Sequence, residues 1–252
     1  MKSALITGGN GGLGRALARR LHGQGWHTVL MDIDIAGLAA DDRQTPIKVD
    51  LTDATALAHA AKTAIAARPS IDLVIYNAGI THIGGFADTD DPTHRRVFEV
   101  NYFAAVNLAR EMVAPIRASR GTHLAISSVA GFAPLYHRTA YAASKHAMEG
   151  FFASLRSEEA VHGVRTLIAA PSFVATNPGN PQRQPNGIAR PGSASDGVDE
   201  MSPQEAAKAI LRGLEKARAF IPVGRVARLA WWINSLSPRL YQRLMERNIR
   251  GR

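Results

Sequence analysis

Tyr141 and Lys145 are the two residues whose types and spacing most directly suggest chemistry. They stand four positions apart, so on a helix their side chains share one face. An ammonium beside a phenol favours the phenolate, and a tyrosine whose pKa falls from about 10 toward neutrality can serve as a general base. The same spacing also occurs as an ordinary surface contact on any helix, so the pair indicates a proton-transfer site only if other residues support it.

A glycine-rich run, Thr7 to Gly14, follows a short apolar segment and precedes a helical pattern. Glycines at such a turn let the backbone approach a pyrophosphate at the positive end of a helix. The run fits GxGxxG from Gly9 and also TGxxxGxG from Thr7, so the glycines alone leave the register open. A simple turn without a ligand is the competing interpretation.

Asp32 ends the second apolar run and bears on the choice of cofactor. A carboxylate in this position accepts hydrogen bonds from the adenosine ribose hydroxyls and repels a 2′-phosphate, which favours NAD(H) over NADP(H). Asp34 follows two residues later, so the alternative that Asp32 merely caps the next segment stays open.

The elements that must position these residues alternate between short apolar runs and helical patterns. We expect a helix from residue 13, one capped by Thr52 or Asp53, and further helices over 92–119 and 141–162. The alternation is typical of an α/β, Rossmann-like, doubly wound parallel sheet of about seven strands flanked by helices, with ligands at the carboxyl ends of the strands. The strands that we expect lie at 4–7, 28–31, 47–50, 73–76, 122–127 and 164–170.

The last third of the chain adds a loop and a clear helix start. Residues 177–201 are rich in Pro, Gly, Asn and Ser without periodicity, which predicts a long loop that acts as a lid. Ser202 to Glu205 forms a capping box with proline at the first helical position, so a helix is expected to begin there.

With these motifs in place, the chain resembles the short-chain dehydrogenase/reductase family in its single-domain form, whose length of about 250 residues suits the 252 found here. The resemblance covers residues 1 to about 223, which we expect to form the catalytic domain. It rests on motifs in the family's order and spacing: TGxxxGxG from Thr7 to Gly14, Asp50, Asn77-Ala78-Gly79, Asn101, Ser128, and Tyr141-x-x-x-Lys145.

The resemblance implies an NAD(P)-dependent oxidoreductase that interconverts a secondary alcohol and a ketone or aldehyde by hydride transfer. Ser128 would hydrogen-bond the substrate oxygen and Tyr141 would exchange its proton. Lys145 would hold the nicotinamide ribose and lower the pKa of Tyr141, while Asn101 would position a water. The family pattern also implies the glycine register and the cofactor contacts: Gly8, Asn10, Gly12, Leu13, Gly14, Asp32, Asp50, Leu51, Asn77, Ala78, Gly79, Tyr141, Lys145, Val174 and Thr176.

Two departures from the family pattern affect the cofactor contacts. Ser172 follows Pro171 where the family usually has glycine, so a positive φ at that position would be strained. The link between Asp32 and Asp50 is short, which leaves little room for a helix beside the adenine.

Composition excludes several classes of protein. No cysteine is present, which removes disulfides, thiolate catalysis and Cys-ligated metal sites, and the nine histidines are scattered without ligand spacing, so we expect no metal. The N-terminus lacks the apolar region of a secretion signal, and no apolar run approaches the roughly 18 residues that cross a bilayer. We therefore expect a cytoplasmic protein, associated at most with a membrane surface.

Residues 224–252 are expected to form a basic, amphipathic, helical C-terminal extension. They carry most of the net charge of +9, with seven arginines and Glu246 as the one acidic residue. Three interpretations stay open: packing against the protein's own pocket or a partner subunit, contact with an anionic membrane, or an ordinary solvated helix. The first two suit a bulky hydrophobic substrate. The apolar stripes are Leu229, Trp232, Ile233 and Leu236, then Leu240, Tyr241, Leu244 and Met245.

Other functions are weighed against catalysis. A catalytically silent NAD(H)-binding sensor or scaffold is the main alternative, although intact Ser128, Tyr141 and Lys145 argue against it. We expect no nucleic acid, because aromatic residues in the tail follow the apolar stripes and do not alternate with the arginines. The resemblance further implies a small-molecule substrate and a homodimer or homotetramer built on the helices at 92–119 and 141–162.

Overall fold

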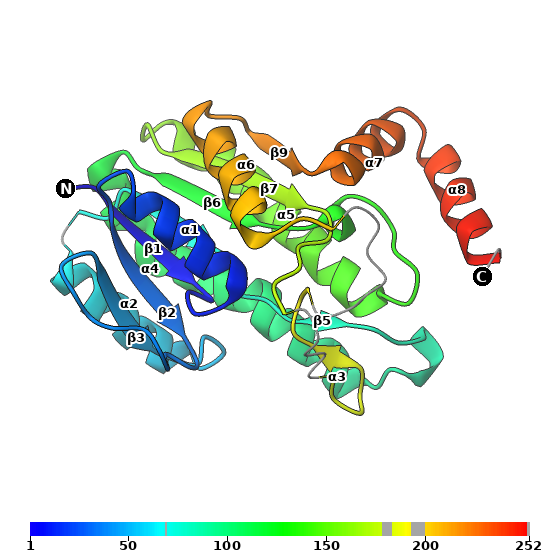
Figure 1. Cartoon of the computed structure of the whole chain (residues 1–252), viewed down its shortest axis with the longest axis horizontal. Helices are drawn as coiled ribbons and strands as arrows, with labels where there is room; N and C mark the ends of the chain where they lie inside the picture. Colours follow the sequence, from blue (N-terminus) through cyan, green and yellow to red (C-terminus); the bar gives the residue numbers. More distant parts are fainter. Residues whose placement is uncertain (69, 178–182, 193–199, 251–252) are drawn as a thin grey trace.

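The computed structural model describes residues 1–68, 70–177, 183–192 and 200–250, the side chains of the last three excepted. A parallel sheet of seven strands forms its centre, in the order β3-β2-β1-β4-β6-β7-β9 (Figure 1). Its strands are β1 Ser3–Thr7, β2 His27–Asp32, β3 Gln44–Lys48, β4 Leu73–Tyr76, β6 Thr122–Ile126, β7 Arg165–Pro171 and β9 Phe220–Val223. The strand order reverses beside β1, so a crevice at the carboxyl ends of β1 and β4 is the expected ligand site.

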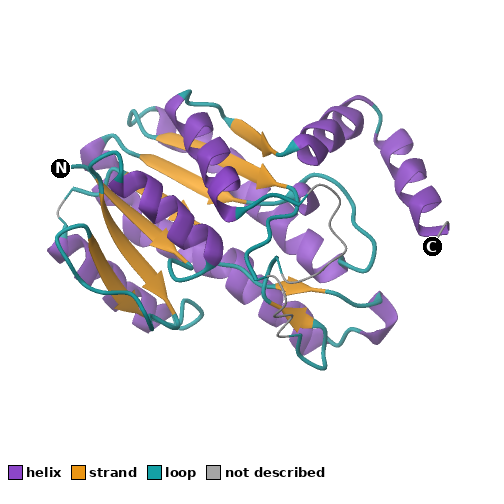
Figure 2. Cartoon of the chain, in the orientation of Figure 1, coloured by secondary structure: helices purple, strands orange, loops and turns teal. Residues whose placement is uncertain are grey.

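Helices cover both faces of the sheet, as Figures 1 and 2 show. α1 and α6 share one hydrophobic core with one face, and α2, α4 and α5 share a second core with the other. The α-helices are α1 Gly12–His22, α2 Ala54–Ala67, α3 Asp91–Phe98, α4 Ala104–Ser119, α5 Thr139–Ala160, α6 Pro203–Glu215, α7 Arg225–Leu236 and α8 Pro238–Arg250. Short 3-10 turns occur at Phe86–Asp88 and Val129–Gly131, and a π-helical turn at Glu99–Phe103 joins α3 to α4.

The strands are almost continuously apolar because both faces of the sheet are covered. In β1, Leu5 points into the core of α2, α4 and α5, while Ala4 and Ile6 point into the core of α1 and α6. All three are fully buried. The predicted doubly wound α/β fold is therefore confirmed, and most strand and helix bounds fall within a few residues of those expected.

The predicted bounds of the third strand were wrong. β3 spans Gln44–Lys48 instead of 47–50, and it pairs with β2 from Thr28 to Asp32. It is an edge strand that contains Pro46, so its residues lack the apolar pattern that marks the central strands. Residues 33–43 contain turns and no helix, in agreement with the short link seen in the sequence.

Part of the predicted lid loop lies outside the described residues, namely 178–182 and 193–199. The described part is not a free loop. A short strand β8, Ile188–Ala189, pairs antiparallel with β5, Thr81–His82, and both of its residues are buried. The capping box that begins α6 is confirmed, since Ser202 and Glu205 cap one another reciprocally.

α7 and α8 form an arm beyond the last strand of the sheet (Figure 1). Its inner side is anchored by a small core in which Ala227, Ala230 and Tyr241 pack with Val129 and Ala133 from the segment after β6. The extension predicted from residue 224 is thus helical, and it packs beside the end of the sheet that holds the polar residues described next.

Candidate active site

One cavity of about 1080 Å³ opens at the carboxyl ends of the parallel strands. This volume lies slightly above the usual range for ligand pockets, so the cavity has room for a large cofactor and a second molecule. Every residue predicted for the site lines this cavity except Gly14 and Asn101, which contact the lining residues Gly8 and Ile80.

The glycine run forms a tight turn between β1 and α1. Gly8 has φ +62°, and a Cβ at Gly14 would collide with the carbonyl oxygen of Gly8. Both positions thus require glycine, in keeping with the TGxxxGxG register. Asn10, Gly12 and Leu13 place the start of α1 against the cavity, where backbone N–H groups and the helix dipole favour an anion.

Hydrogen bonds between the end of β1 and the segment after β4 hold the glycine turn in place. Thr7 Oγ1 accepts from the backbone N–H groups of Asn77 and Ala78, each at 3.0 Å. Asn77 Nδ2 donates to the carbonyls of Thr7 at 3.0 Å and Gly8 at 3.1 Å. Asn77-Ala78-Gly79 therefore holds the glycine turn in place and forms the adjoining wall of the cavity.

Three carboxylates, those of Asp32, Asp34 and Asp50, line the end of the cavity nearest β2 and β3. Asp32 accepts from the backbone N–H of Asn10 at 2.9 Å and from that of Asp34 at 3.3 Å, so it braces the glycine turn as well as facing the cavity. Asp50, with Leu51 beside it, accepts from the backbone and the hydroxyl of Thr52. These bonds hold the pKa of Asp50 below its usual value, so it is ionised at neutral pH.

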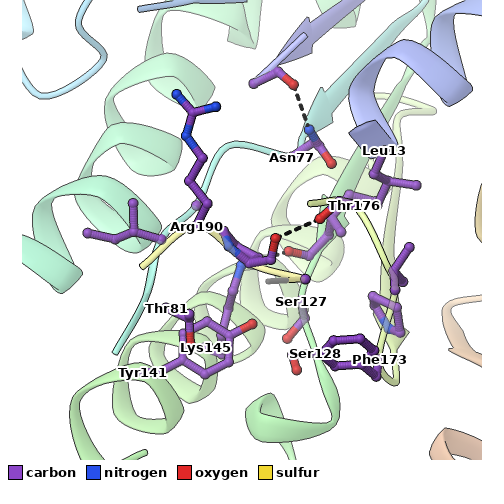
Figure 3. Close-up of a pocket in the computed structure, with 18 of the residues that line it drawn as sticks. Leu13, Asn77, Thr81, Ser127, Ser128, Tyr141, Lys145, Phe173, Thr176 and Arg190 are labelled. Carbon is purple, nitrogen blue, oxygen red and sulfur yellow. Dashed lines mark hydrogen bonds between the residues drawn. The ribbon is translucent and has the colours of Figure 1, made fainter. Parts of the chain in front are cut away.

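Tyr141 lies in the first turn of α5 with its hydroxyl toward Ser128, which follows β6 (Figure 3). Burial raises the pKa of the Tyr141 phenol, while its hydrogen bond with Ser128 and the charge of Arg138 act in the opposite direction. The expected lowering of the Tyr141 pKa is therefore not found in this arrangement, because desolvation of the phenolate outweighs the groups that favour it.

Lys145 lies one turn further along α5 and is buried. Its Nζ donates to the carbonyl of Ile126 at 2.9 Å, at the end of β6, so the ammonium is held at the cavity wall. Burial lowers the pKa of Lys145 to about 8, and the charge of Glu149 acts against that shift.

Asn101 is fully buried in the π-helical turn, and its side chain is engaged by protein groups. Its Oδ1 accepts from the backbone N–H of Ile80 at 2.8 Å. Its Nδ2 donates to the Ile80 carbonyl at 3.0 Å and to Ser144 Oγ at 2.9 Å. Ser144 in turn donates to the carbonyl of Tyr141 at 2.8 Å. Asn101 thus connects Ile80, which lines the cavity, to the helix that carries Tyr141. The sequence had suggested only that Asn101 positions a water.

Glu149 is a residue that sequence reasoning missed. It accepts a hydrogen bond of 2.6 Å from Ser127 Oγ. Burial raises its pKa to about 7, while the Ser127 hydrogen bond and the charge of Lys145 lower it. The signal was present in the sequence, since Glu149 follows Lys145 by four residues and so shares its face of α5.

The segment after β7 closes the cavity over the glycine turn. Val174 and Thr176 line it, and Gly12 approaches the backbone of Thr176 so closely that a Cβ at Gly12 would lie 2.9 Å from the Thr176 oxygen. Thr176 Oγ1 donates to the Pro191 carbonyl at 2.6 Å (Figure 3). Ser172 avoids a positive φ, so the strain considered for this position does not arise.

The end of the cavity away from the glycine turn is largely apolar. Leu135 and Phe173 line it together with residues of the C-terminal arm, which are Val226, Leu229, Ala230, Ile233, Tyr241, Leu244 and Met245. The arm thus contributes directly to the cavity of its own chain, one of the interpretations left open by the sequence. Among the residues that the structure describes, no group of three His, Asp or Glu side chains is placed to hold a metal ion.

Comparison with known proteins identifies the family of this chain. The family model described as short chain dehydrogenase matches residues 2–187. The dehydrogenase/reductase SDR family member 7B of Bos taurus is 34% identical over 262 residues, which cover 96% of this chain and 79% of the relative.

Solved structures share the fold. A short chain dehydrogenase from Burkholderia cenocepacia J2315, in complex with NADP, superimposes with a TM-score of 0.84 over 97% of this chain and 99% of its own, at 23% identity. A 4-hydroxyisoleucine dehydrogenase complexed with NADH has a TM-score of 0.64 over 69% of this chain and 74% of its own, at 28% identity.

Proposed function

The chain belongs to the short-chain dehydrogenase family, and on that premise we propose that it interconverts a secondary alcohol and a ketone or aldehyde by hydride transfer with a nicotinamide cofactor. The observation that carries the proposal is the convergence of Ser128, Tyr141 and Lys145 on one cavity that also contains the glycine turn. A binding protein without turnover would have no need of a phenol, a hydroxyl and an ammonium at this place.

The residues present fit a nicotinamide dinucleotide. Gly8 and Gly12 line the cavity at the start of α1, where backbone N–H groups and the helix dipole suit a pyrophosphate. Asp32 faces the cavity at the end of β2 and supports NAD(H) over NADP(H), because a second negative charge beside this carboxylate is unfavourable. Structural neighbours with NADH and with NADP both exist, so the preference rests on Asp32. When bound, the nicotinamide accepts or supplies the hydride.

Tyr141 is proposed to carry the proton. With its pKa raised by burial, the phenol is protonated at neutral pH and ready to donate to the oxygen of a carbonyl substrate. In the direction of alcohol oxidation the phenolate accepts the hydroxyl proton instead. Ser128, which shares a hydrogen bond with the phenol, orients the same substrate oxygen.

Lys145 is proposed to support Tyr141 and the cofactor ribose from the cavity wall. Its ammonium is fixed by the Ile126 carbonyl, so its charge stands at a defined place in a site of low polarity. Because its pKa is about 8, this charge is lost as the pH rises above that value. Asn101 acts as a positioning residue through Ile80 and Ser144.

A bulky hydrophobic substrate suits the far end of the cavity. Leu135, Phe173 and Ile233 offer apolar surface there, with no charged group from the arm among the lining residues. Such surface binds by excluding water from the substrate, which favours extended or cyclic apolar compounds over small polar sugars.

We also propose a homodimer or homotetramer that uses the outer sides of α4 and α5. An aromatic cluster joins the π-helical turn before α4 to α5, in which the ring centroid of Tyr102 is 5.0 Å from that of Phe103 and 6.3 Å from that of Phe151. Phe103 is 43% exposed in the single chain, which a partner helix would cover. Light scattering of the purified protein gives the number of subunits.

The experiment that tests the function combines binding and turnover in the wild-type protein. Fluorescence titration is expected to give tighter binding of NADH than of NADPH, and Asp32→Ser is expected to narrow that difference. A screen of hydrophobic ketones and secondary alcohols, followed at 340 nm, is expected to find turnover. Tight NADH binding without turnover on any of them would favour a sensor or scaffold instead.

A further inference from the structure

The C-terminal arm presents apolar side chains to solvent along one side of α7. Leu229, Trp232 and Leu236 follow one another at helical spacing and are 62%, 58% and 77% exposed. The opposite side of the same helix is used for packing, because Ala227 and Ala230 are buried and Trp231 stacks on Phe220 at 5.9 Å. α7 is therefore apolar on both sides, although only one of them is covered within the chain.

α8 continues this exposed surface. Tyr241 and Met245 pack inward, whereas Leu240 and Leu244 are 48% and 40% exposed. Helical spacing places Arg243 and Arg247 beside these two leucines. We call the set Leu229, Trp232, Leu236, Leu240 and Leu244 the arm face.

Charge distinguishes between the possible occupants of the arm face. Residues 224–252 hold seven arginines and one acidic residue, Glu246. A second copy placed arm to arm would bring two strongly positive segments together, with hardly any carboxylate to offset them. A surface of anionic lipid headgroups over a hydrocarbon interior complements both the arginines and the apolar side chains, including the interfacial tryptophan.

The arm face is also continuous with the cavity. Leu229 and Leu244 belong to the exposed set and at the same time line the cavity, one from each helix. The apolar end of the cavity is therefore bordered by exposed leucines of both helices. Among the described residues, every helix is too short or too polar to span a bilayer.

From these observations we propose that the arm face binds the surface of an anionic lipid bilayer, with α7 and α8 lying at the headgroup level. The cavity mouth then faces the lipid, and an apolar substrate enters from the membrane side. The binding part of this proposal is independent of the reaction, because it concerns the outer surface of the arm and can be measured without turnover.

The test is cosedimentation of the full chain with vesicles of phosphatidylcholine alone or with 30% phosphatidylglycerol. We expect binding to the anionic vesicles that weakens in high salt. Trp232→Ser with Leu236→Ser, two changes outside the cavity wall, is expected to lower the partition coefficient about tenfold or more. The matched control is Phe86→Ser with Val161→Ser, two residues that are 71% and 82% exposed elsewhere and whose loss is expected to leave binding unchanged.

A second pair of variants tests the charge. Arg243→Gln with Arg247→Gln removes two exposed arginines of α8 and is expected to reduce binding to anionic vesicles about fivefold for each charge. Arg19→Gln with Arg20→Gln removes the same charge from exposed positions of α1 and is expected to have a much smaller effect.

Three outcomes would overturn the proposal. In the first, the wild-type protein does not bind anionic vesicles. In the second, the control variants lose as much vesicle binding as the arm variants. In the third, the wild-type protein is a dimer that binds no vesicles and that dissociates when Trp232→Ser and Leu236→Ser are introduced. The last outcome would assign the arm face to a second copy of the chain.

Discussion

Replacement of Asn101 by alanine tests whether this buried amide holds the site together. The side chain makes three hydrogen bonds, with the Ile80 N–H at 2.8 Å, the Ile80 carbonyl at 3.0 Å and Ser144 Oγ at 2.9 Å. Each contributes about 1 kcal/mol net, and the Ile80 groups lose their side-chain partner in a partly buried place. We expect Asn101→Ala to lower the free energy of unfolding by about 3–5 kcal/mol, a large share of the roughly 5–15 kcal/mol available to a domain.

Urea unfolding followed by circular dichroism measures this loss. An unchanged m-value, the slope of the free energy of unfolding against urea concentration, would show that only stability has changed. Ser144→Ala serves as the comparison, because it removes the hydrogen bonds with Asn101 Nδ2 and the Tyr141 carbonyl but keeps both bonds to Ile80, so it is expected to cost less, about 2 kcal/mol. A loss of less than 1 kcal/mol for Asn101→Ala would refute the reasoning, since the three hydrogen bonds of Asn101 would then contribute little to the free energy of unfolding. We also expect kcat to fall in Asn101→Ala more than the affinity for NADH, because Asn101 positions the helix of Tyr141.

Three further perturbations follow from the structure. Gly14→Ala places a methyl group against the carbonyl of the first glycine in the turn, so we expect fluorescence titration to show NADH affinity reduced more than tenfold, while Gly150→Ala, which has open space, leaves it unchanged. In the wild type, the Glu149 carboxyl has its pKa raised to about 7 in the folded state, so the free energy of unfolding falls as the pH rises from 5 to 8 and this proton is lost. Glu149→Gln removes the titrating group and should make this fall smaller. Urea titrations that give parallel pH profiles for the two proteins would contradict this. Glu159→Gln breaks the 2.6 Å pair with Arg117 and is expected to cost about 1–3 kcal/mol at pH 7, a loss that shrinks as the pH falls through the lowered pKa of Glu159; a cost independent of pH would exclude the ion pair as its cause.

The pattern of apolar residues in the sequence predicted the fold well where burial determines which residue types occur. β1, β4 and β7 are apolar because both of their faces are covered, and their positions follow from the sequence within a few residues. β3 did not follow, because an edge strand with Pro46 carries little apolar signal. The pairing of Ile188–Ala189 with β5 joins segments far apart in the chain, which local patterns do not report.

The candidate site was predictable as a list of positions but not as an electrostatic arrangement. Spacing placed Tyr141 and Lys145 on one face of α5, yet it could not give the depth of burial, which raises the pKa of Tyr141. In the same way, the contact of Glu149 with Ser127 depends on how closely α5 approaches the end of β6. Burial and close approach between elements are properties of the packed fold, so sequence spacing alone does not determine them.

The most direct test of the proposed reaction compares wild type with Tyr141→Phe on a ketone or alcohol that the wild-type protein turns over. The substitution removes the phenolic hydroxyl and keeps the ring that packs in the cavity wall. We predict that turnover at 340 nm falls by about 10²–10⁴-fold while NADH binding, measured by fluorescence, stays within about twofold of wild type. Turnover retained by Tyr141→Phe would contradict the assignment of Tyr141 as the proton-transfer residue.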